Sequence, residues 1–271
     1  MRSIRTGLRY ALALALASLL GQGCAVDRLW EPSREEVLER VLPSAVQIVI
    51  QQHEGRRVRT GSGVAVASRR DGEQMQCFVI TAGHTVSGLV GQSEVYVIFG
   101  GYRGDSVKAM ASVVAHKDSA DTDLALLRTE SDRCFPARTR GAGLLGEPVW
   151  VVGFPWGRQM TLTRGIVSQV GIGDANDRET AARLMVDAPV SYGSSGGGVY
   201  EARGGSLIGV VEGYSTARVT SKGSDPAWYI DVPVPGQTFV TPLSDVQRFL
   251  SRTGYADLLT IAPGHAGLAR P

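Results

Sequence analysis

Short runs rich in β-branched residues, separated by glycine, aspartate and serine, are the feature that most constrains the fold of this 271-residue chain. Such runs are typical of β-strands, and many in succession indicate an all-β barrel or sandwich rather than an α/β fold. The first six runs are residues 45–51, 63–67, 77–81, 95–99, 111–116 and 124–128. A further six are residues 148–153, 165–171, 184–187, 198–200, 207–211 and 238–241. The chain therefore repeats its architecture, and we expect two all-β units.

Helices are expected only at the two ends of this pattern. Ser33 and Glu36 fit a capping box, which predicts a short helix ending near Leu42, before Pro43. A second helix is predicted after strand 238–241, with Thr241 as its N-cap and Pro242 as its first residue.

The segment 129–146 is rich in Arg, Gly, Ser and Pro and is predicted to join the two units. This places the first unit at 33–140 and the second, with its helix, at 141–253. Residues 254–271 show no strong periodicity, so we expect a partly disordered tail. Residues 172–183 and 215–237 are predicted to be surface loops.

The N-terminus has the pattern of a secretory signal. Three arginines precede about ten apolar residues, which are too few to span a bilayer. The pair Gly23 and Cys24 resembles a bacterial lipoprotein box, so Cys24 is a candidate for lipidation, with ordinary signal cleavage nearby as the alternative. We therefore expect a signal at 1–23 and an exported protein of the bacterial periplasm or cell envelope, attached to the outer membrane if Cys24 carries lipid.

Charge gives no reason to expect a nucleic-acid partner. The formal net charge of +2 becomes −1 without residues 1–23, which hold three arginines and no acidic residue. Two cysteines, Cys77 and Cys134, remain after Cys24. A disulfide can form between them in an oxidising compartment, but the sequence favours two small buried hydrophobic residues.

Three residues in order along the chain suggest nucleophilic catalysis. His84 follows a predicted strand, Asp123 leads into another, and Ser195 stands before three glycines. A serine hydroxyl becomes a useful nucleophile when a histidine takes its proton and a carboxylate orients that histidine. The order His, Asp, Ser is one in which this triad recurs. For each residue alone, a structural role is the ordinary alternative.

The segments around these residues resemble those of a protease family. They are 37–48, Gly61-Ser62-Gly63-Val64, 80–86, 122–127, 152–157, 163–168 and 187–197. Together they are similar to chymotrypsin-fold (trypsin-like) serine proteases, most of all to the bacterial HtrA (Deg) type, over residues 35 to 253. The sequence departs from the usual pattern of this family at two small residues, Ser194 before Ser195 and Gly83 before His84.

The resemblance implies an all-β fold of two antiparallel β-barrels, with His84 and Asp123 on the first and Ser195 on the second. Ser195 would be the nucleophile, His84 the general base and acid, and Asp123 its orienter. The backbone N–H groups of Gly193 and Ser195 would form the oxyanion hole. Protein or peptide substrates are implied, and no PDZ domain, metal or other cofactor is expected.

Substrate-binding candidates lie on both sides of the nucleophile: Ser191, Tyr192, Val211, Glu212 and Gly213. If Glu212 faces the pocket, it can favour a basic residue at the cleavage site. The leading hypothesis is an exported serine endopeptidase that acts through an acyl-enzyme. The alternative is a catalytically silent envelope protein that binds peptides or partners on the same fold.

Overall fold

The computed structural model of the protein describes residues 31–52, 55–89, 93–102, 104–119, 122–171, 184–221 and 228–261. The predicted signal at 1–23, Cys24 and the predicted loop at 172–183 lie outside these residues. None of the helices in the described part of the chain is long and apolar enough to cross a membrane.

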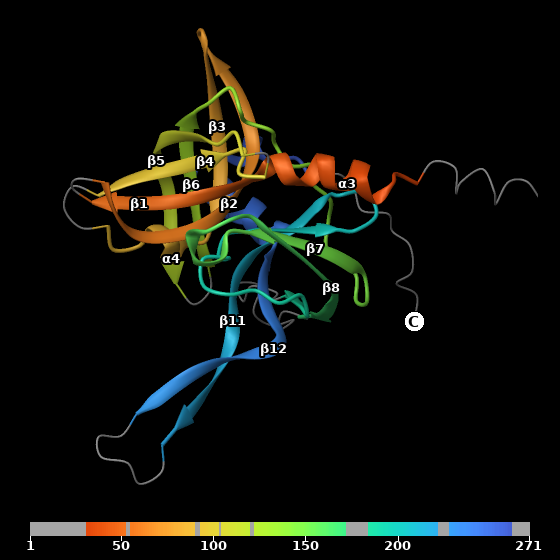
Figure 1. The fold of residues 1–271 in the computed structure, drawn as a ribbon. Coiled ribbons are helices and arrows are strands. Elements are labelled where there is room, and N and C mark those ends of the chain that lie inside the picture. The colour runs from red at the N-terminus through yellow and green to blue at the C-terminus, as the bar shows by residue number, and fades with distance from the viewer. Residues whose placement is uncertain are drawn as a thin grey trace, which may run out of the picture.

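Two closed, six-stranded antiparallel barrels form the body of the molecule (Figure 1). The first consists of β1 (Ala45–Gln52), β2 (Arg56–Asp71), β3 (Gln74–Thr81), β4 (Glu94–Phe99), β5 (Val107–Ser119) and β6 (Thr122–Glu130). The second consists of β7 (Pro148–Gly153), β8 (Thr161–Val170), β9 (Leu184–Val186), β10 (Gly198–Glu201), β11 (Leu207–Thr220) and β12 (Tyr229–Pro242). All twelve predicted strands are present, and the predicted all-β class is confirmed.

Both barrels close in the same strand order. The first runs β1-β2-β3-β6-β5-β4, and the second repeats this order from β7 to β12. Alternate residues of each strand point inward and fill the barrel, as Val46, Ile48 and Ile50 do on β1. A third apolar cluster lies between the barrels and includes Trp150, Tyr200 and Leu207. This cluster joins the barrels, so residues on the first can support a site on the second.

The two predicted helices pack on this third cluster. Helix α3 (Arg34–Val41) begins with the predicted capping box of Ser33 and Glu36. A 3-10 turn (Leu42–Ser44) follows it and contains Pro43. Helix α5 (Leu243–Arg252) begins one residue later than predicted, because Pro242 has extended backbone and forms the N-cap.

One prediction about an irregular segment is wrong. Where a loop was expected at 215–237, β11 and β12 continue as a paired ribbon through Thr216–Thr220 and Tyr229–Pro233, which projects from the second barrel (Figure 1). At the start of the expected tail, Leu258 and Leu259 are buried and a 3-10 turn (Ala256–Leu258) forms, and partial disorder of the tail stays a prediction. Residues 262–271 lie outside the description.

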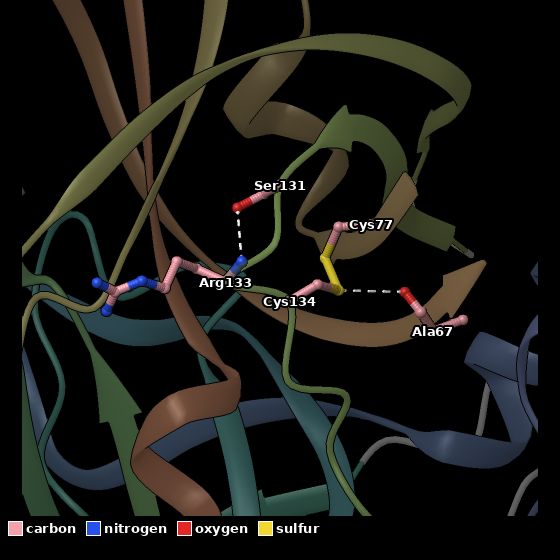
Figure 2. The surroundings of a disulfide bond; sticks show 5 residues. All are labelled: Ala67, Cys77, Ser131, Arg133 and Cys134. Carbon is pink, nitrogen blue, oxygen red and sulfur yellow. Dashed lines mark hydrogen bonds between the residues drawn. A yellow bond between two sulfur atoms is a disulfide. The ribbon is translucent and has the colours of Figure 1, made fainter. Parts of the chain in front are cut away.

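Cys77 on β3 and Cys134 after β6 form a disulfide, with their Cα atoms 5.6 Å apart (Figure 2). The expectation of two separate buried cysteines is therefore wrong. Cys134 Sγ also lies 3.5 Å from the carbonyl oxygen of Ala67. The bond closes a loop over a sequence separation of 57 residues. By chain entropy, such a long loop stabilises the folded state by about 4 kcal/mol.

Candidate active site

His84 lies in the single-turn helix α4 (Gly83–Val86), and Asp123 is the second residue of β6. His84 Nδ1 lies 2.6 Å from Asp123 Oδ2, and the His84 backbone N–H donates to Asp123 Oδ1 at 2.7 Å. The His84 side chain is 47% exposed, whereas that of Asp123 is 12% exposed. The hydrogen bond to Asp123 raises the pKa of His84 above its ordinary value, although burial opposes this rise. One carboxylate therefore fixes both the backbone and the ring of the histidine.

Arg59 on β2 supports the same helix, a role that sequence reasoning missed. Its Nη1 donates to the carbonyl oxygens of His84, Thr85 and Ser87 at 3.0, 3.3 and 2.6 Å. Carbonyls at the end of a helical turn have no partner within it, and a cationic side chain can satisfy them. The charge of Arg59 also lowers the pKa of His84, against the effect of Asp123. A lone arginine in a strand carries no sequence signal of this role.

Two glycines give the loop around Ser195 its shape. Gly193 has φ +88° and Gly196 has φ +84°, a region that residues with a Cβ rarely adopt. A Cβ on Gly196 would lie 2.1 Å from the carbonyl oxygen of Ser62. The sequence Gly-Ser-Ser-Gly is therefore needed for the turn itself as well as for the position of the serine.

Two backbone N–H groups beside Ser195 are available to a ligand. Among the described residues, the N–H groups of Gly193 and Ser195 donate no hydrogen bond, while that of Ser194 between them does. The Tyr192 carbonyl accepts from the Trp156 N–H at 2.6 Å. Because the C=O and N–H of a trans peptide point in opposite directions, this bond directs the Gly193 N–H away from Trp156. Such a pair of donors can hold an oxygen that gains negative charge.

Ser62 on β2 holds this loop from the first barrel, and its role was also missed. Its backbone N–H donates to the Ser195 carbonyl at 2.8 Å, and its Oγ donates to the Gly193 carbonyl at 2.7 Å. The same Oγ accepts from the Phe154 N–H at 2.8 Å, and Ser62 is fully buried. The Gly-Ser-Gly motif was noticed in the sequence, but a contact between two barrels cannot be read from local spacing.

A hollow of about 420 Å³ brings the candidate residues together. His84, Gly193 and Ser195 line it. Its other walls come from both barrels and consist of Arg59, Thr60, Thr85, Trp156 and Tyr192. The structure thus gathers a histidine, its carboxylate partner, a serine and two free N–H donors at one cleft.

The five predicted substrate-binding residues do not line one pocket. Tyr192 lines the hollow, whereas Ser191 lines a second one, of about 250 Å³, between the loop and strands β7 and β8. Val211 is 1% exposed, so its side chain belongs to the core of the second barrel. Glu212 and Gly213 follow on β11, where a Cβ on Gly213 would meet nothing within 4 Å. The preference proposed for Glu212 stays a prediction.

Comparison with known proteins identifies the family. The family model described as the trypsin-like peptidase domain matches residues 61–210, which is more than half of the chain. The chain belongs to the trypsin-like peptidase family. The match contains His84, Asp123 and Ser195, and it begins at the Gly-Ser-Gly motif.

Relatives of this trypsin-like peptidase include HtrA-type proteases. The mitochondrial serine protease HTRA2 of Bos taurus is 28% identical, over 88% of this chain and 46% of its own length. A probable periplasmic DegP-like serine endoprotease of Hahella chejuensis is 29% identical, over 72% of this chain and 36% of its own. The chain thus spans less than half the length of these curated relatives. The predicted resemblance to HtrA-type proteases is confirmed.

A solved structure agrees with the fold of this trypsin-like peptidase. The serine endoprotease from Yersinia pestis superposes with a TM-score of 0.59 at 19% identity. The match covers 82% of this chain and 66% of that one. At this level of identity the comparison supports the double-barrel fold.

Proposed function

We propose that this protein is a serine endopeptidase in which Ser195 is the nucleophile, His84 the general base and acid, and Asp123 the group that orients His84. The observation that carries the proposal is the 2.6 Å contact between His84 Nδ1 and Asp123 Oδ2, in a cleft that His84 shares with Ser195. A carboxylate on Nδ1 fixes the tautomer in which Nε2 can accept the serine proton. Proteins or peptides are the proposed substrates.

The reaction would proceed through an acyl-enzyme. Ser195 Oγ attacks the scissile carbonyl carbon while His84 Nε2 takes the hydroxyl proton. The tetrahedral intermediate collapses, the C–N bond breaks, and His84 gives its proton to the leaving amine. A water molecule then attacks the ester, again with His84 as the base, and releases the acid product and Ser195.

The oxygen of the tetrahedral intermediate would be held by the Gly193 and Ser195 N–H groups. Their freedom from other bonds among the described residues supports a site that is ready before substrate arrives. Loss of one donor of this kind typically lowers kcat by about 10²–10³-fold. The contact from Trp156 N–H to the Tyr192 carbonyl would keep the Gly193 donor in place.

Labelling with a fluorophosphonate probe tests the triad. We expect the wild-type protein to be labelled, Ser195→Ala to show no labelling, and His84→Ala to be labelled far more slowly. Ser68→Ala, an exposed serine on β2, is the matched control and should be labelled like the wild type. A folded wild-type protein that is never labelled, or labelling that persists in Ser195→Ala, contradicts the proposal. Peptide binding without turnover would instead favour the silent envelope protein.

We further propose that the peptidase is exported to the bacterial cell envelope. The signal-like segment at 1–23 and the description of the Hahella relative as periplasmic support this location. Cys24 is the candidate for a lipid anchor. Mass spectrometry of the mature N-terminus tests both points, because a diacylglyceryl cysteine at Cys24 and a simple cleavage site differ in mass. An intact Met1 in envelope fractions would contradict cleavage of the signal.

A further inference from the structure

Trp156 combines an unusual backbone conformation with an exposed ring, and packing against the protein does not explain this combination. It lies in the 3-10 turn Pro155–Gly157 with φ +56°, the one non-glycine residue of the described chain with positive φ. Its side chain is 63% exposed, although a tryptophan normally buries most of its rings. Strained backbone and an exposed aromatic residue beside a candidate nucleophile together point to a binding role.

Tyr192 lies against Trp156 and extends the same aromatic surface. The two ring centroids are 5.2 Å apart with a tilt of 58°, and Tyr192 is 57% exposed. Both rings line the hollow that contains His84 and Ser195. The first barrel contributes Arg59 to the same lining. A lining that combines two aromatic rings with an arginine suits a flat π-system.

The hollow lies on the side of Ser195 where the leaving amine departs. This step rests on the proposed function, in which His84 gives its proton to that amine. The walls beyond His84 come from β2 and α4, through Arg59, Thr60 and Thr85, and no residue of β11 lines the hollow. The strand β11 contacts the loop at two other points: the Gly196 N–H donates to the Val211 carbonyl at 2.7 Å, and the Tyr214 ring centroid lies 5.7 Å from that of Tyr192. A substrate residue in the hollow is therefore the one that follows the cleaved bond.

We propose that Trp156 and Tyr192, together with Arg59, form a subsite that selects an aromatic side chain immediately C-terminal to the cleaved bond. An aromatic ring would stack on the exposed indole and phenol and would also contact the guanidinium. Trp156 is the specificity-determining residue in this arrangement, because its exposed ring is the larger of the two. Its backbone N–H also holds the Tyr192 carbonyl, so a test must separate the ring from the backbone.

The variant Trp156→Asn separates these two roles. Asparagine tolerates positive φ and keeps the backbone N–H, but it removes the ring. Two peptides that differ only in Phe or Ala after the cleaved bond supply the readout, as the ratio of their kcat/KM values. We expect the wild type to prefer Phe, and Trp156→Asn to lower the Phe-to-Ala ratio by about tenfold, mainly through KM. Trp156→Phe should restore most of the preference.

The controls distinguish failure of this inference from failure of the proposed function. Trp228→Asn, which removes an exposed tryptophan near the ribbon, should keep the wild-type ratio. A peptide that ends in a methylamide carries no side chain and no aromatic ring after the cleaved bond, so hydrolysis of this amide reports catalysis alone. Equal proportional losses on the Phe peptide, the Ala peptide and the methylamide in Trp156→Asn would overturn the inference. A wild type that cleaves the methylamide but treats Phe and Ala alike would also overturn it. A wild type that is neither labelled by fluorophosphonate nor hydrolyses the amide would overturn the proposed function itself.

Discussion

The histidine and aspartate of the site are held within the first barrel, whereas the loop that carries Ser195 is held by both barrels. Asp123 on β6 bonds both the backbone and the ring of His84, and Arg59 on β2 closes the helix that carries His84. The Ser195 loop instead depends on Ser62, which reaches across from the first barrel to the Gly193 and Ser195 carbonyls.

The two parts of the site therefore depend on the barrels to different extents. The proposed base and its orienter are fixed by contacts within one barrel. The proposed nucleophile and its N–H donors take their geometry from the docking of the two barrels through the cluster of Trp150, Tyr200 and Leu207. A variant that breaks a contact within the first barrel should therefore disturb His84, whereas a variant that breaks a contact across the cleft should disturb the Ser195 loop.

The largest effect is expected from breaking the pair within the first barrel. Asp123→Asn keeps the size of the side chain but favours the wrong tautomer of His84, so kcat should fall by about 10⁴-fold. Steady-state kinetics on a peptide substrate measure this loss, and circular dichroism verifies the fold. Activity within tenfold of the wild type would show that Asp123 does not orient the base.

A smaller loss is expected from breaking the contact across the cleft. Ser62→Ala leaves the Gly193 carbonyl and the Phe154 N–H without their buried partner, at a cost of about 1–3 kcal/mol. If the loop relaxes to recover these bonds, kcat and the rate of fluorophosphonate labelling should both fall by about 10- to 100-fold. Ser68→Ala on the same strand is the control. Unchanged labelling in a folded Ser62→Ala protein would mean that the loop holds its shape without the first barrel.

Removal of the disulfide should affect stability more than chemistry. The double variant Cys77→Ala and Cys134→Ala is expected to lower the free energy of unfolding by about 2–4 kcal/mol, because the unfolded chain regains the freedom of a long loop. Urea denaturation measures this change, and labelling at 25 °C should continue while the protein stays folded. An unchanged unfolding midpoint and slope would contradict the expectation.

The smallest effect concerns the charges around His84. The negative charges of Asp123 and Asp118 raise the pKa of His84, while the positive charge of Arg59 lowers it. Since Asp118 stabilises the protonated imidazole, Asp118→Asn should lower this pKa, and the neutral base should persist to lower pH. The acid limb of the kcat/KM profile should then move to lower pH, and added salt should reduce the difference. A shift to higher pH would contradict the assigned sign.

The strands and the capping box could be predicted because each has a local signal in the sequence, and the same holds for the pairing of His84 with Asp123 beside the Ser195 loop. The ribbon of β11 and β12 could not, because it projects from the barrel and its residues 216–220 are all exposed. Pro233 and Pro235 in β12 also argue against a strand. The disulfide and the roles of Ser62 and Arg59 depend on which distant segments meet in space, and composition or spacing does not encode that.

The disulfide has a consequence for when activity can develop. His84 and Asp123 both lie between Cys77 and Cys134, so the covalent loop encloses the base and its orienter but not Ser195. A chain made where thiols stay reduced would have a less stable first barrel and a less firmly held base. If the protein is exported, as we propose, oxidation would complete that barrel only after secretion, so the proposed activity would reach its full strength outside the cell that makes the protein, which is a form of temporal self-protection.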